Sequence, residues 1–162
     1  MQKITPCLWF DNQAEEAVHF YASIFRDVKI GSTARYSEGL PGTPGTVMTV
    51  NFSLFGQEFI ALNGGPHFRF NEAVSFVVHC KGQEETDYYW NALTRDGKEA
   101  QCGWLKDKFG VSWQIVPEEF LALMQSGDAE KTQRVMKALM SMRKIDIAAL
   151  ERAYNGEPEL VQ

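Results

Sequence analysis

The chain has 162 residues, of which 44% are hydrophobic and 12% aromatic, which is enough apolar surface for one domain or two small fused halves. A net charge of −5 argues against a broad nucleic-acid surface, and no apolar run approaches the roughly 20 residues that cross a bilayer. The N-terminus shows no signal-peptide pattern, and the three cysteines are widely spaced without a CxxC motif. These features predict a cytoplasmic protein with reduced thiols.

The first part of the chain alternates between strand-like and helix-like patterns. Apolar residues at helical spacing follow a short apolar strand, and Asp11 or Asn12 is predicted to cap that helix. Further strands follow, two of them joined by a tight turn around Gly56. The predicted order is a strand at 4–10, a helix at 11–25 and strands at 28–38, 46–55 and 57–63.

The same order begins again about 70 residues later. A strand, a helix and further strands are predicted at 73–80, 81–97, 98–107 and 110–116. This spacing indicates a duplicated βαβββ module. From residue 118 the pattern is helical, with helices at 118–127, 128–142 and 146–154, and with Asp128 and Asp146 as caps of the last two.

These elements predict an α+β fold in which two repeated βαβββ modules form a cupped sheet, followed by a C-terminal helical extension. The predicted boundaries are 1–70 for the first module, 71–117 for the second and 118–157 for the extension, within one structural domain. The helical extension is expected to cover a sheet face or a partner subunit.

Four stretches carry a resemblance to a known family: "ITPCLWFDNQAEEAVHFY", "FIALNGGPHFRFNEAVSFVV", "GWLKDKFGVSWQIVP" and "MKALMSMRKIDIAALERAY". They resemble the PhnB-like family, also labelled the 3-demethylubiquinone-9 3-methyltransferase domain family. This family is part of the vicinal oxygen chelate superfamily, with glyoxalase I, bleomycin-resistance proteins and dioxygenases. The resemblance implies a glyoxalase-like cup, usually within a homodimer.

The resemblance also implies where a metal would be held. Metal-using relatives place one ligand on the first and last strand of each module, and the matching positions here are Thr5 or Pro6, Ala61, Ser75 and Gln114. This set has no carboxylate and no imidazole, although Asn63 lies two residues beyond Ala61 on the same strand face. We therefore expect no tight catalytic metal and no cofactor.

Gln114 interrupts the apolar run at 111–116, and a buried amide without partners costs about 1–3 kcal/mol. It is expected to bond Ser75, Asn63, water or a ligand, so an internal network and a ligand-facing role both stay open.

Three further residues are candidates for ligand binding. His79 either acts as an acid or base at the mouth of the cup or lies in solvent. Arg69 either holds an anionic or carbonyl-bearing ligand or lies in an exposed connector. Trp113 either packs in the core or forms an apolar wall of the cup.

The favoured function is binding of a small organic ligand in a cup between the modules, with ligand contacts from Gln114, Ser75, Asn63, His79, Trp113 and Arg69. Whether the protein is an enzyme, and which residues would be catalytic, stays open. The alternatives are a metal-dependent isomerase, lyase or dioxygenase, the methyltransferase of the family label, and a sequestering protein. A homodimer is expected, without nucleic-acid or membrane partners.

Overall fold

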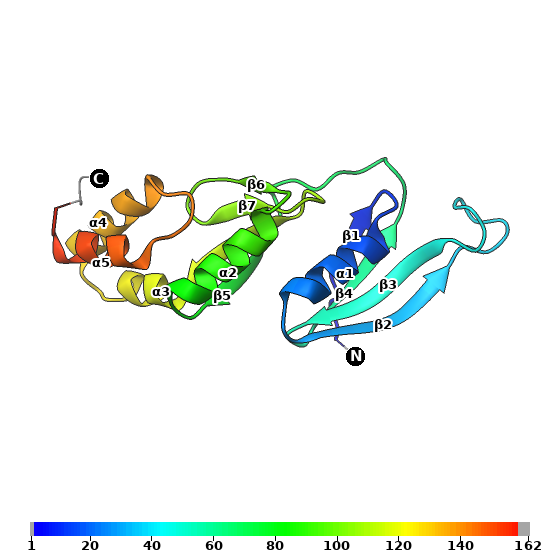
Figure 1. The fold of residues 1–162 in the computed structure, drawn as a ribbon, viewed down its shortest axis with the longest axis horizontal. Coiled ribbons are helices and arrows are strands. Elements are labelled where there is room, and N and C mark those ends of the chain that lie inside the picture. The colour runs from blue at the N-terminus through cyan, green and yellow to red at the C-terminus, as the bar shows by residue number, and fades with distance from the viewer. Residues whose placement is uncertain (1, 159–162) are drawn as a thin grey trace. The chain divides into compact units, whose positions relative to one another are not determined.

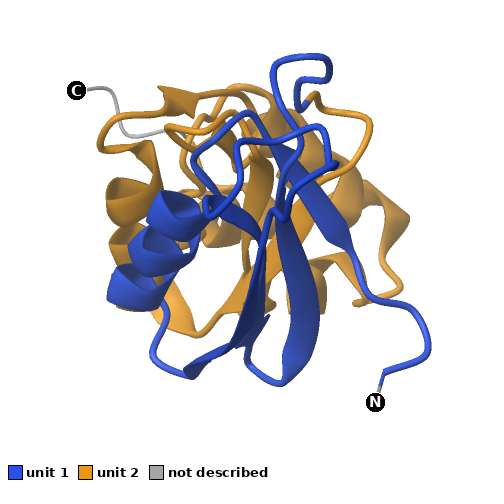
Figure 2. Cartoon of the chain, turned by 90° about the vertical axis from the view of Figure 1, so that its right-hand side faces the viewer, with its two compact units in different colours: residues 1–70 blue, residues 71–162 orange. Residues whose placement is uncertain are grey.

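The computed structural model describes residues 2–158. The chain divides into two compact units, residues 1–70 and 71–162, which Figure 2 colours separately. Each unit contains one four-stranded sheet. In the described part of the chain, no helix is long and apolar enough to span a bilayer.

The first unit has the predicted strand–helix–three-strand order (Figure 1). Its strands are ordered β1-β4-β3-β2, with β1 parallel to β4 and the other pairs antiparallel. Its elements are β1 (Cys7–Phe10), α1 (Ala14–Ile24), β2 (Val28–Arg35), β3 (Val47–Leu54) and β4 (Gln57–Asn63).

Aromatic packing beneath α1 fixes which sheet face is the core. Tyr21 of α1 stacks on Phe52 at 6.1 Å between ring centroids, and Phe52 stacks on Phe59 at 5.2 Å. β3 and β4 are joined by the two-residue turn Phe55–Gly56, and both residues have positive φ angles, 48° and 79°. Such a turn matches the twist of the flanking strands and so sets their register.

The second unit repeats this order and then adds helices. Its sheet has the order β5-β8-β7-β6, with β5 parallel to β8, just as β1 is parallel to β4. This repetition confirms two βαβββ modules in an α+β fold. The elements are β5 (Phe76–Cys80), α2 (Gly82–Thr94), β6 (Lys98–Glu99), β7 (Trp104–Lys106) and β8 (Ser112–Pro117).

The last three helices have a small core of their own, made by Val135, Leu139, Ile145 and Leu150. They are α3 (Glu118–Met124), α4 (Ala129–Met140) and α5 (Ile147–Asn155). The segment before α5 is held to α2 by Gln83, which donates to the Ile145 carbonyl at 3.0 Å and accepts from the Ile147 amide at 2.9 Å.

Two of the predicted helix caps are confirmed and one is wrong. Asp128 accepts from the Lys131 amide at 3.1 Å, and Asp146 caps α5 in the same way. The expected caps of α1, Asp11 or Asn12, make no capping bond, because the helix begins later, at Ala14.

Candidate functional site

Each sheet has one face covered by the helix of its own module and one that is not, which we call the open face. In the second unit, Leu105, Trp113 and Ile115 lie on the covered face and are 1%, 3% and 0% exposed. Because side chains alternate along a strand, Gln114 lies on the open face together with its β5 neighbour Val77. Val77 is 45% exposed.

Gln114 is bonded to Ser75 on this open face. Its Nε2 donates to Ser75 Oγ at 2.9 Å, and both side chains are partly buried. The structure thus brings together two of the residues selected from the sequence. Among the described residues, the second Nε2 proton and the Oε1 acceptor of Gln114 make no hydrogen bond, so the pair can still bind a further polar group.

Trp113 lies in the core and does not form a wall of the open face. Its indole Nε1 donates to Asp107 Oδ2 at 2.9 Å, and Asp107 is only 3% exposed. The other carboxylate oxygen of Asp107 accepts from the amides of Phe109 and Val111. The indole therefore helps to satisfy a buried carboxylate. The tryptophan that shares the open face with Gln114 is its β7 neighbour Trp104.

Asn63 also lies on the covered face, where it takes the place of the missing cap of α1. Its Oδ1 accepts from the Ala14 amide at 2.8 Å, and its Nδ2 donates to the Val47 carbonyl at 3.0 Å. Ala61 shares this face and is 0% exposed. The structure therefore places Ala61, which the resemblance matched to a metal-ligand position, away from the open face of β4, which carries Glu58, Ile60 and Leu62.

His79 and Arg69 are exposed in the described structure. His79 lies near the end of β5, on the same strand face as Val77. Arg69 lies in the irregular segment 64–75. Their contacts with a ligand stay predictions.

The open face of the first unit contains a hollow of about 510 Å³ that the sequence analysis did not identify. At its centre, Asn51 Nδ2 donates to Ser32 Oγ at 2.8 Å. Ser32 lies in a β-bulge between Ile30 and Thr33, where the pairing register with β3 shifts. The bulge was signalled by Gly31, because a glycine within a strand often marks one.

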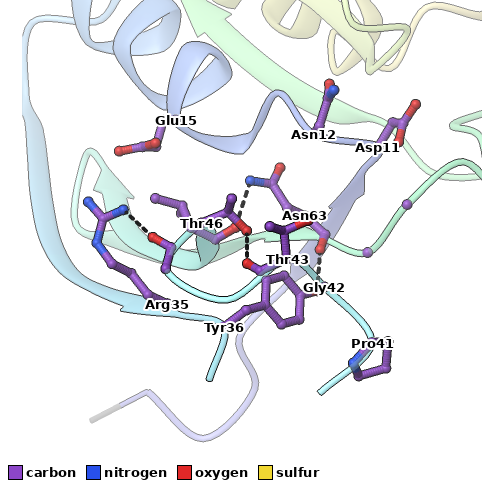
Figure 3. A pocket seen from close by; sticks show the side chains of 14 residues that line it. Asp11, Asn12, Glu15, Arg35, Tyr36, Pro41, Gly42, Thr43, Thr46 and Asn63 are labelled. Atoms are coloured by element: carbon purple, nitrogen blue, oxygen red, sulfur yellow. Dashed lines mark hydrogen bonds between the residues drawn. The ribbon is translucent and has the colours of Figure 1, made fainter. Parts of the chain in front are cut away.

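A second hollow, of about 590 Å³, lies at the end of the first unit's sheet (Figure 3). It is bordered by the start of α1, the end of β2, the 41–47 loop and the end of β4. Tyr36 donates its hydroxyl proton to the backbone carbonyl of Asn63, which ties the loop to β4. Asp11, predicted only as a helix cap, and Glu15 both line this hollow.

Cys7 and Cys80 are poor nucleophiles in this structure. Burial, together with the nearby Glu85 carboxylate, raises the pKa of the Cys80 thiol to about 12. Burial also raises the pKa of Cys7. Among residues 2–158, no group of three or more His, Cys, Asp or Glu side chains is placed to hold a metal ion.

Comparison with known proteins gives a consistent result. The family model described as 3-demethylubiquinone-9 3-methyltransferase matches residues 2–116. A putative 3-demethylubiquinone-9 3-methyltransferase, PhnB protein, from Bacillus cereus is 41% identical, with a TM-score of 0.65 over 72% of this chain and 99% of that chain. No match was found among curated proteins.

Two more distant structures are also similar. A protein from Pseudomonas aeruginosa is 18% identical, with a TM-score of 0.60 over 73% of this chain and 98% of that chain. A glyoxylase/bleomycin resistance protein/dioxygenase domain from Frankia is 13% identical, with a TM-score of 0.46 over 72% of this chain and 92% of that chain.

Proposed function

Because the chain belongs to the 3-demethylubiquinone-9 3-methyltransferase (PhnB-like) family, we propose that it binds a small organic molecule on the open faces of its sheets, in the cup that this fold implies. The ligand is held by neutral amide and hydroxyl groups, without a tightly bound catalytic metal. The protein acts as a homodimer in the cytoplasm. Its three free thiols are compatible with that reducing compartment.

The observation that carries this proposal is the pair formed by Gln114 and Ser75. The hydrogen bond between them orients the Gln114 amide. The pair keeps hydrogen-bond donors and acceptors that face away from the core. Apolar neighbours flank it, Val77 on β5 and Trp104 on β7. A few oriented polar groups within apolar surroundings are typical of small-molecule sites.

The metal-dependent alternative needs several imidazole or carboxylate groups placed together, and residues 2–158 contain no group of three or more such side chains that could hold an ion. The strand positions around the pair carry Val77, Trp104 and Val116, with His79 near the end of β5. The open face of β4 in the first unit carries Glu58, Ile60 and Leu62. Divalent catalytic ions are usually held by imidazole or carboxylate groups. Elemental analysis of protein purified without chelators tests this alternative: stoichiometric nickel, zinc, iron or manganese would support it.

The methyltransferase of the family label does not fit the residues present. An S-adenosylmethionine site of the usual kind needs a Gly-rich turn between a strand and a helix. Here residues 11–13, which join β1 to α1, are Asp-Asn-Gln, and the Gly-rich segment 39–45 joins two antiparallel strands. Calorimetric titration with S-adenosylmethionine is expected to show no stoichiometric binding.

Native mass spectrometry of the purified protein, with a thermal-shift screen of a metabolite library, tests the proposed ligand site. We expect a bound small molecule or a stabilising compound. Gln114→Leu and Ser75→Ala are expected to weaken its binding, whereas Gln133→Leu, which changes an exposed amide on α4, is not. Binding unaffected by Gln114→Leu, or no ligand in either assay, would contradict the proposal.

A further inference from the structure

The hollow at the end of the first unit's sheet, which we call the end hollow, lies apart from the open face of that sheet. The two hollows share no lining residue. The volume of the end hollow, about 590 Å³, is within the range of roughly 300–1,000 Å³ that small-molecule sites occupy. Its lining residues come from four stretches of the chain, 11–15, 35–36, 41–47 and 63–65, so folding of the unit assembles it.

The walls of the end hollow are held in place without a ligand. Arg35 Nη1 donates to the Gly45 carbonyl at 2.9 Å, and Tyr36 exchanges backbone bonds with the same loop. Gly42 lies so close to the Tyr36 ring that an added Cβ would be 2.4 Å from it. This contact requires glycine and packs the loop against the ring.

Both signs of charge line the end hollow. Figure 3 shows Glu15 extending from α1 and Arg35 from β2, with Asp11 at the rim. In the part of the chain that the structure describes, the ion pairs involve none of these three side chains. Arg35 uses one guanidinium proton on Gly45 and has four others to donate.

The capping arrangement of α1 leaves its acidic residues available. Asn63 satisfies the Ala14 amide, so neither Asp11 nor Glu15 is needed for that role. A guanidinium and a carboxylate that border one hollow, each without an ion-pair partner, are complementary to a molecule that carries both an amino group and a carboxylate.

We propose that the end hollow binds a free amino acid, with the amino group at Glu15 and the carboxylate at Arg35. Asp11, at the rim, adds a second carboxylate to the lining. The hydroxyls of Thr43 and Thr46 and the Asn63 side chain, which line the same hollow, provide the polar surroundings. This site is independent of the Gln114–Ser75 pair and of its ligand.

The test uses ¹H–¹⁵N correlation spectra of the full chain, titrated in turn with each of the common free L-amino acids. Butylamine and sodium butyrate, which each carry one of the two charges, are titrated at matched ionic strength. We expect saturable shifts at Glu15, Tyr36 and Gly65 with at least one amino acid, and weaker binding of both single-charge probes.

Glu15→Gln and Arg35→Gln are each expected to weaken this binding about tenfold, which corresponds to about 1.4 kcal/mol. Glu130→Gln and Lys137→Gln, matched changes at exposed positions of α4, are expected to leave it unchanged. Gln114→Leu should also leave it unchanged, which separates this site from the proposed function. The proposal would be overturned if no amino acid gave a saturable shift, or if butylamine or butyrate bound as tightly as the amino acid. Unchanged amino-acid binding by Glu15→Gln or by Arg35→Gln would also overturn it.

Discussion

Asn63 shows how one side chain can join distant parts of a unit. It links the start of α1 to the start of β3 through both atoms of its amide. Asn63→Ala removes both bonds and is expected to lower the free energy of unfolding by about 1–3 kcal/mol. Urea unfolding followed by circular dichroism measures this change.

The matched control for that measurement is Asn12→Ala, which removes an exposed amide next to the same helix. Its side chain makes no capping bond, so the expected change is within about 0.5 kcal/mol. Equal destabilisation by the two substitutions would show that the Asn63 bonds contribute nothing specific.

The Cys80 thiol should be unreactive in the folded protein. With a pKa of about 12 it is protonated at neutral pH, and the thiolate is the nucleophilic form. We expect iodoacetamide to label Cys80 far more slowly in native than in urea-unfolded protein, as measured by peptide mass spectrometry. Similar labelling rates in the native and the unfolded protein would contradict the burial of the Cys80 thiol.

The sequence indicates the role of a residue well where that role is set by its near neighbours. Asp128 and Asp146 were identifiable as caps because each bonds an amide three residues later. The alternation along β8 places Trp113 and Gln114 on opposite faces, so the expectation that both contact one ligand was at odds with that pattern, and the structure places Trp113 in the core. The role of Asn63 depends on its hydrogen bond with Ala14, 49 residues away, and no local sequence pattern predicts that contact.

At the scale of elements, β4 explains the misassigned face in the first unit. Its sequence, QEFIALN, has apolar residues on both faces, Phe59 and Ala61 on one and Ile60 and Leu62 on the other. Alternation therefore cannot identify the covered face, and a shift of one residue exchanges all side chains. The aromatic stack from Tyr21 to Phe59 decides it, and that contact is tertiary.

The contact between α2 and the segment before α5 should depend on pH. Lys144 Nζ lies 2.7 Å from Asp87 Oδ1, and this bond, with a further one from Gln83, lowers the pKa of Asp87. A lowered folded-state pKa stabilises the fold above the unfolded value of about 3.9, and this contribution is lost as pH falls through the folded value.

Asp87→Asn is therefore expected to destabilise the protein at neutral pH by no more than about 1 kcal/mol, because the ion pair is partly exposed. The difference in the free energy of unfolding between this variant and wild type should shrink in acid. Urea unfolding at neutral and at acidic pH measures this difference. Asp96→Asn, at an exposed position after α2, should have little effect at either pH. A difference for Asp87→Asn that grows in acid would contradict the assigned ion pair.

At the scale of the whole molecule, the repeated order of elements was predictable because helices and strands have different hydrophobic periods. The two hollows of the first unit were not, since their residues are brought together by strand pairing and by a loop. The sequence therefore points to single polar residues such as Gln114, but it does not show groups that pairing brings together, such as Asn51 with Ser32.

The division into two compact units predicts where the folded chain is cut first. Phe68 and Phe70 pack on Trp9 and Phe10 of the first unit, whereas Arg69 between them is exposed and lies in no helix or strand. Exposed irregular segments are preferred sites of proteolysis. Brief trypsin treatment should therefore cut after Arg69 and release fragments that match the two units.

Mass spectrometry of the early products, compared with those of Arg69→Gln, checks this prediction. The variant should lose these two fragments and leave the cuts elsewhere unchanged, because only an exposed side chain is replaced. If Arg69 instead holds a ligand, as the sequence predicts, addition of that ligand should slow the wild-type cut. If cuts within helices appear before any cut after Arg69, the segment 64–75 is protected, which would contradict its exposure in the structure.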